Sequence, residues 1–103
     1  MKLVLTSTIL AMVATGSAYA DAAAGKAVYT ANCEKCHAAN GEGKAVIAKM
    51  LNATMKPLGS ADVKAKSDAA LAKDITEGVG KMKPVKISGE QVKDVIAYIR
   101  TLK

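Results

Sequence analysis

The 103-residue sequence has no phenylalanine and no tryptophan, and it has only three tyrosines, two cysteines and one histidine. An interior built mainly from alanine and aliphatic side chains has few large groups to fill it. Chains of this size bury a limited apolar core and often depend on a disulfide, a metal or a cofactor. The shortage of aromatic residues therefore predicts a single small domain in which a large, flat group could fill the interior.

The sequence also lacks an apolar run of the roughly 20 residues needed to span a bilayer. Its most apolar stretch, Leu3–Ala14, follows Lys2 and leads to Ala18-Tyr19-Ala20, the small-x-small pattern that signal peptidases recognise. We therefore expect residues 1–20 to be a cleaved signal peptide and residues 21–103 to be an exported, periplasmic domain without a membrane span. The alternatives are an uncleaved membrane anchor and a first structural helix.

Negative charge is scarce, since nine Asp and Glu stand against fifteen Lys and Arg, giving a net charge of +6. The lysines are spread along the chain without a set of aromatic stacking residues, so we expect no nucleic-acid binding. A basic surface suits a partner with acidic docking patches, although an ordinary solvated surface also accounts for most lysines. The carboxylates are scattered and form no acid–base set, so we expect no enzymatic activity.

No segment alternates well enough to predict a strand, and the helical patterns favour an all-α bundle of three to five helices. We expect helices over residues 22–33, 44–52 and 68–77, and a final helix after Ser88. Ser88 and Gln91 have the spacing of a capping box. The apolar residues of the final helix recur at helical spacing; they are Val92, Val95, Ile96, Ile99 and Leu102.

Two details concern the terminal helices. Gly25 falls inside the first helix, where glycine costs about 1 kcal/mol relative to alanine. Either another element passes close to Gly25, or the helix is frayed at its start. Arg100 and Lys103 are expected in the last turn of the final helix, where positive charge is favourable.

The strongest motif is Cys33-Glu34-Lys35-Cys36-His37, which has the C-x-x-C-H pattern of c-type haem attachment. Two thiols at this spacing can reach the two vinyl groups of a porphyrin, and the next residue can bring its imidazole to the iron. A thioredoxin-like pair needs a preceding strand, a zinc site needs more ligands, and a plain disulfide leaves His37 unexplained. We therefore expect one covalent haem c on Cys33 and Cys36, with His37 as the proximal axial iron ligand.

Because His37 is the only histidine, the sixth iron position must be filled by another group or by nothing. A methionine thioether opposite histidine raises the reduction potential. Met82-Lys83-Pro84 and Met55-Lys56-Pro57 occupy similar loop settings, so both methionines are candidates. Met50 falls in an expected helix, and we expect it to fill space in the core.

Together these segments resemble the class I (mitochondrial-type) cytochromes c, in particular the small bacterial periplasmic monohaem proteins. The resemblance covers residues 21–103 and is carried by Gly25–Tyr29, Cys33–His37, Asn40–Gly43, Ile75–Gly78, Met82 and Val92–Leu102. It implies a small helical fold wrapped around one haem, with Met82 as the distal ligand and Met55 as runner-up. It also implies that the first and last helices cross at Gly25, with Tyr98 packing nearby. One departure is Lys83, which separates Met82 from Pro84, whereas the family commonly has proline directly after the methionine.

The resemblance further implies a monomeric carrier that shuttles single electrons between redox partner proteins. Lys81, Lys83 and Lys86 flank Met82 and either steer acidic partners or are ordinary solvated lysines. The alternative function is a haem protein with an open or weakly held sixth site, acting as a sensor or an enzyme component.

Overall fold

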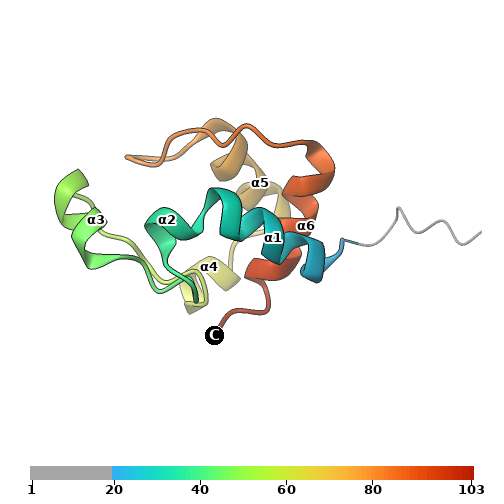
Figure 1. The fold of residues 1–103 in the computed structure, drawn as a ribbon, viewed down its shortest axis with the longest axis horizontal. Helices are drawn as coiled ribbons and strands as arrows, with labels where there is room; N and C mark the ends of the chain where they lie inside the picture. The colour runs from blue at the N-terminus through green and yellow to red at the C-terminus, as the bar shows by residue number, and fades with distance from the viewer. Residues whose placement is uncertain (1–19) are drawn as a thin grey trace, which may run out of the picture.

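The computed structural model describes residues 20–103, and this part of the chain is helical (Figure 1). Its six helices are α1 (Ala22–Asn32), α2 (Glu34–His37), α3 (Ala45–Leu51), α4 (Ala61–Lys64), α5 (Asp68–Glu77) and α6 (Gly89–Ile99). The expected all-α class is confirmed. The structure adds α2 and α4, which are single turns and too short to leave a periodic apolar pattern. Apart from Ala20, the expected signal peptide lies outside the described residues.

The crossing of α1 and α6 forms the centre of the fold, with the two helices packed directly on each other (Figure 1). A Cβ atom at Gly25 would lie 1.9 Å from the carbonyl oxygen of Asp94, a distance that no side chain can occupy. The rings of Tyr29 and Tyr98 meet beside this contact, with centroids 5.2 Å apart. Of the two explanations for Gly25, the close approach of another element is therefore correct, and the expected crossing at Gly25 is confirmed.

The core lies around this crossing and is completed by α5, which packs against α6. Its members are aliphatic except for one tyrosine, and they come from three helices. The buried cluster consists of Val28, Tyr29, Leu71, Ile75, Val92, Val95, Ile96 and Ile99. The C-x-x-C-H motif follows directly on α1, so the best-packed part of the molecule supports it.

The chain end corrects one expectation, because α6 ends at Ile99 and neither Arg100 nor Lys103 lies in its last turn. Arg100 is the C-cap, and its guanidinium reaches the chain from the end of α4 to the start of α5. It donates to the carbonyl oxygens of Val63, Lys64 and Lys66, at 2.6 to 3.3 Å, and to the carboxylate of Asp68. These partners bind the guanidinium more specifically than the α6 dipole could, so Arg100 joins α6 to the start of α5.

Helix α3 stands apart from the core, at the end of the molecule opposite α6 (Figure 1). None of its residues is buried, and Met50 is 76% exposed. The expectation that Met50 fills core space is therefore wrong, because α3 does not join the buried cluster. Within residues 20–103, no helix has the length and apolar character needed to cross a bilayer.

Candidate functional site

The two cysteines lie on a single helical turn that continues α1 after a break of one residue. Cys33 is both the C-cap of α1 and the N-cap of α2, and its N–H donates to the Tyr29 carbonyl at 2.8 Å. The N–H groups of Cys36 and His37 both bond to the Cys33 carbonyl, at 3.2 and 3.0 Å. The motif is thus wound into one turn by its own backbone and anchored to α1. Both thiols are unpaired and half-buried, as thioether bonds to a partly enclosed group require.

The imidazole of His37 is held in a form that suits a metal ligand. It makes no hydrogen bond to the described residues, and its Nδ1 is buried without a partner. An unpartnered buried polar atom is costly, so it indicates a site completed by a group that the protein chain does not supply. Burial also lowers the pKa of His37, which keeps the ring in the neutral form that binds metals.

The chain after the motif folds back over it and satisfies its carbonyl groups. The N–H of Gly43 donates to the His37 carbonyl at 2.8 Å, and the N–H of Lys44 donates to the Cys36 carbonyl at 2.9 Å. Gly43 has a φ of 85°, in the region that favours glycine. These two bonds fix the end of α2, and the bond from Cys33 to Tyr29 fixes its start, so α2 is held at both ends.

Met82 lies on a tight hairpin between α5 and α6. Val79 and Met82 exchange both backbone hydrogen bonds, at 3.0 and 2.8 Å, around a turn that contains Gly80 at a φ of 55°. The N–H of Val85 bonds to the Ile75 carbonyl and closes the loop onto α5. In Figure 1 this loop, drawn in orange, extends past α5 toward the end of the molecule where α3 lies. The half-buried Met82 is therefore presented by a preformed loop.

Met55, the other candidate ligand, packs beside the chain that leaves His37. A Cβ atom at Gly43 would lie 3.2 Å from the Met55 Cβ and 3.5 Å from its sulfur. Met55 also lines a shallow pocket of about 210 Å³ with Lys44, Ala45 and Ala48. Its thioether is thus in contact with the segment that folds back over α2.

These residues together fit a c-type haem: two free thiols on one turn, a neutral imidazole directly after them, and a methionine on a separate loop. A zinc site finds no support in residues 20–103, where no three His, Cys, Asp or Glu side chains gather. The site therefore has the donor set of haem attachment and lacks that of zinc binding.

The comparison with known proteins agrees with this site. The family model described as "Cytochrome c" matches residues 22–103, and the chain belongs to the cytochrome c family. The chain is similar to the solved structure of the c-type cytochrome KustC0563, with 28% sequence identity and a TM-score of 0.65; the match covers 77% of this chain and 96% of that one. No curated protein matches the chain. Members of the family carry covalently attached haem c, so the expected cofactor and the class I resemblance are confirmed.

Two parts of the site could not be found from its motifs. The first is the hydroxyl of Tyr29, which bonds to the carbonyl of Ala38 directly after His37. The second is Gly78, which makes room for the Met82 backbone. Both residues lie in segments that carry the family resemblance, but nothing in a single sequence shows that Tyr29 reaches Ala38 or that Gly78 approaches Met82.

Proposed function

We propose that the protein is a periplasmic carrier of single electrons, with one haem c bound covalently to Cys33 and Cys36. His37 and Met82 serve as its axial ligands. The observation that carries the proposal is the neutral, unpartnered imidazole of His37, placed directly after the cysteine pair in a chain of the cytochrome c family. When bound, the haem supplies an iron that changes between the ferric and ferrous states.

The choice of Met82 over Met55 rests on where the two side chains are held. A haem attached beside His37 would need its second iron ligand from a segment separate from the one that carries His37. Met55 packs against Gly43, whose N–H bonds to the carbonyl of His37, so it sits beside the backbone that leaves the proximal ligand. Met82 comes from a hairpin fastened to α5, a separate part of the fold. This arrangement supports Met82 as the distal ligand.

The chain contributes rigidity, because a carrier works best when little has to move as the iron changes charge. The cysteine turn is bonded to α1, whose residues Val28 and Tyr29 belong to the buried core. The Met82 hairpin is bonded to α5, which packs on the same core. Both ligand-bearing segments are thus tied to one body, and we expect little rearrangement on electron transfer.

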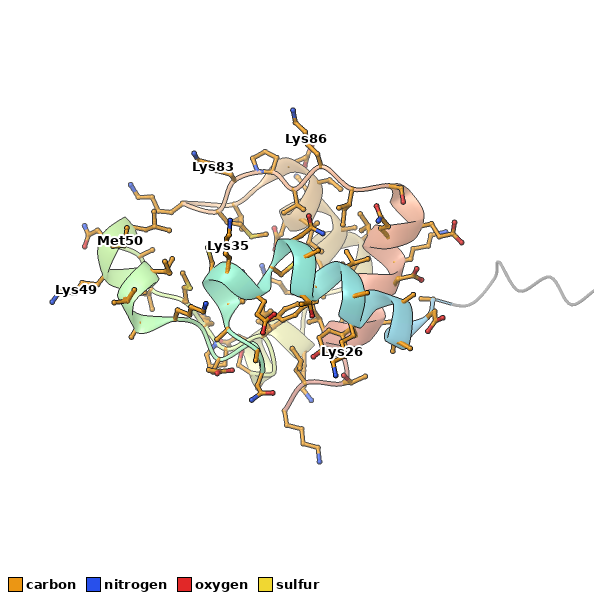
Figure 2. All side chains as sticks on the ribbon, viewed as in Figure 1. Lys26, Lys35, Lys49, Met50, Lys83 and Lys86 are labelled. Carbon is orange, nitrogen blue, oxygen red and sulfur yellow. The ribbon has the colours of Figure 1, made fainter. Side chains whose placement is uncertain are left out.

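The partners in this proposal are redox proteins with acidic docking patches, and the protein acts as a monomer without enzymatic activity of its own. Figure 2 shows Lys83 and Lys86 projecting outward from the Met82 loop, and Lys35 pointing from α2 toward the same side. Lys26 points in the opposite direction from α1. Positive charge is therefore presented around the loop that carries the proposed distal ligand, where it would attract an acidic surface.

The test is a visible spectrum of the protein after export from cells that attach haem c. We expect a Soret band that acid–acetone does not extract, and a weak far-red Met–iron band in the ferric protein that is lost when Met82 is changed to alanine. The measured mass of the exported protein should match a chain that begins at Asp21 and carries one haem. A colourless product would refute the proposal. Retained haem without the far-red band, together with rapid CO binding, would favour the alternative of an open-site sensor or enzyme component.

A further inference from the structure

The residue directly after His37 has an unusual backbone conformation. Ala38 has a φ of 66° and a ψ of 172°, a combination that is essentially restricted to glycine. A residue held there is strained, and it persists only where its surroundings fix it. Because Ala38 is bonded to His37, its conformation determines the direction in which the backbone leaves the proximal ligand.

Two hydrogen bonds reach the carbonyl oxygen of Ala38: one comes from the N–H of Gly41, at 3.3 Å, and the other from a side chain. The hydroxyl of Tyr29 donates a buried hydrogen bond to the carbonyl oxygen of Ala38, nine residues further along the chain. Tyr29 is 1% exposed and packs against Tyr98 at the crossing of α1 and α6, so its ring has little freedom to move. Burial raises the pKa of Tyr29 to about 12, so the hydroxyl remains a donor at ordinary pH. The bond thus connects the most rigid part of the core to the residue behind His37.

Core packing alone does not require this hydroxyl. A phenylalanine would fill the same space in the crossing, and it would bring no polar atom that needs a partner. The hydroxyl also has a specific acceptor, which is the carbonyl of the strained residue next to the proposed iron ligand. This pairing of a buried donor with a strained backbone indicates a role at the site.

We infer that Tyr29 is a positioning residue, which orients the imidazole of His37 by holding the carbonyl of Ala38. This role rests on the proposed function, since it requires His37 to bind the haem iron. Tyr29 lies outside the C-x-x-C-H motif, and its side-chain hydrogen bond goes to Ala38 and not to either cysteine.

The test uses the haem-loaded protein and compares Tyr29→Phe with Tyr98→Phe. Both changes remove one hydroxyl from the same tyrosine pair, but it is the Tyr29 hydroxyl that bonds to the Ala38 carbonyl. The readout is the proton NMR spectrum of the ferric protein, in which the His37 ring protons report the orientation of the imidazole. We expect Tyr29→Phe to shift these resonances and Tyr98→Phe to leave them near their original positions.

A second variant separates positioning from simple loss of stability. Glycine adopts the conformation of Ala38 at little cost, so Ala38→Gly should make the Tyr29 hydroxyl dispensable. In the double variant with Tyr29→Phe, we expect the His37 resonances to return toward those of the unmodified protein. Equal shifts for both tyrosine variants, no shift for either, or no recovery in the double variant would each overturn the inference.

The outcomes also keep this inference apart from the proposed function. If the unmodified protein shows no iron-shifted His37 resonances, the proposed ligation itself fails. If the unmodified protein shows them and Tyr29→Phe leaves them unchanged, ligation stands and only the role of Tyr29 fails.

Discussion

Gly78 lies so close to the carbonyl oxygen of Met82 that a Cβ atom on Gly78 would stand 2.6 Å from that oxygen and 3.0 Å from the ring of Pro84. Gly78 also has a φ of 81° and a ψ of 163°, which only glycine adopts readily. Both facts make Gly78 the residue that allows the Met82 hairpin to close. The hairpin accommodates Lys83 before Pro84, because its shape is set by Gly78 and by the paired bonds of Val79.

We therefore predict that Gly78→Ala weakens or abolishes Met82 ligation while haem attachment at the cysteines survives. The methyl group must displace the Met82 carbonyl, and the backbone strain adds on the order of 1–3 kcal/mol. The measurements are the far-red band of the ferric protein and the rate of CO binding to the reduced protein. We expect the band to be lost and CO binding to become faster.

Gly80→Ala is the matched control for this prediction, because it lies in the same hairpin. Gly80 has a φ of 55°, but a Cβ atom there would meet nothing within 4 Å. Alanine at this position is destabilised only by its left-handed backbone conformation, which costs roughly 1–2 kcal/mol. The far-red band should persist in Gly80→Ala, and equal loss of the band in both variants would contradict the role assigned to Gly78.

The helix crossing gives a second prediction, which concerns stability. Gly25→Ala would place a methyl group 1.9 Å from the Asp94 carbonyl, so α1 and α6 must separate. Overpacking in a core typically costs 1–3 kcal/mol, and we expect about 3 kcal/mol or more because the obstacle is backbone. At roughly 4–8 °C for each kcal/mol, Tm should fall by more than about 10 °C.

Gly89→Ala serves as the control for the crossing. Gly89 begins α6, and a Cβ atom there would meet nothing within 4 Å. Because alanine is the better helix former, this change should leave Tm unchanged or raise it slightly. A comparable fall in Tm for Gly25→Ala and Gly89→Ala would show that the close approach at Gly25 does not control stability.

The sequence predicted the parts of the fold that depend on local signals. The helix expected over residues 68–77 has these bounds in the structure, where the Ser67 side chain caps its start and Gly78 follows its end. The capping box of Ser88 and Gln91 is formed by both reciprocal hydrogen bonds. Sequence reasoning failed at Arg100, because its partners lie more than 30 residues away and no local pattern reveals them.

The candidate site likewise has a part that local sequence predicts and a part that depends on distant contacts. The C-x-x-C-H motif is contiguous, so its residues share one turn whatever the rest of the chain does. The assignments to Cys33, Cys36, His37 and Met82 stay predictions until the haem-loaded protein is measured. The support from Tyr29 and Gly78 depends on close approaches between distant segments, and a single sequence contains no distances.

Arg100 provides a third prediction. Its guanidinium donates to three backbone carbonyls and to Asp68, and Lys at this position cannot reach so many acceptors at once. We expect Arg100→Lys to lower the free energy of unfolding by about 1–2 kcal/mol, since charge-assisted bonds are lost but partly replaced by water. Urea denaturation monitored by circular dichroism measures the change.

The ion pair of Lys66 and Asp74 is the comparison for Arg100. It is 2.7 Å long, but its lysine side chain is 46% exposed. Pairs of this kind contribute about 0–1 kcal/mol, so Lys66→Met should cost clearly less than Arg100→Lys. Because Arg100 donates to the backbone carbonyl of Lys66 and not to its side chain, Lys66→Met leaves that contact intact. A larger loss for Lys66→Met would refute the ranking.

Tyr29 gives a prediction for alkaline pH. Burial raises its pKa from 10.0 to about 12, so the unfolded chain releases this proton more readily than the folded protein. Its contribution to stability is therefore complete below pH 10 and is lost as pH rises toward 12. Tyr29→Phe cannot lose a proton there, so the difference in unfolding free energy between the two proteins should shrink between pH 10 and 12. A difference in unfolding free energy that stays constant across this pH range would contradict the raised pKa of Tyr29.

The final prediction concerns the lysines around the Met82 loop. Because Lys83 and Lys86 project from this loop, Lys83→Glu and Lys86→Glu should slow association with an acidic redox partner. Lys26→Glu makes the same change in net charge on α1 but points the opposite way, so it should slow association less. Stopped-flow electron transfer at several ionic strengths measures the effect. The rate of the unmodified protein should fall steeply with salt, since the screening length shortens to about 8 Å at 0.15 M ionic strength. If all three variants slow the reaction equally, the partner responds to net charge, and these lysines form no docking surface.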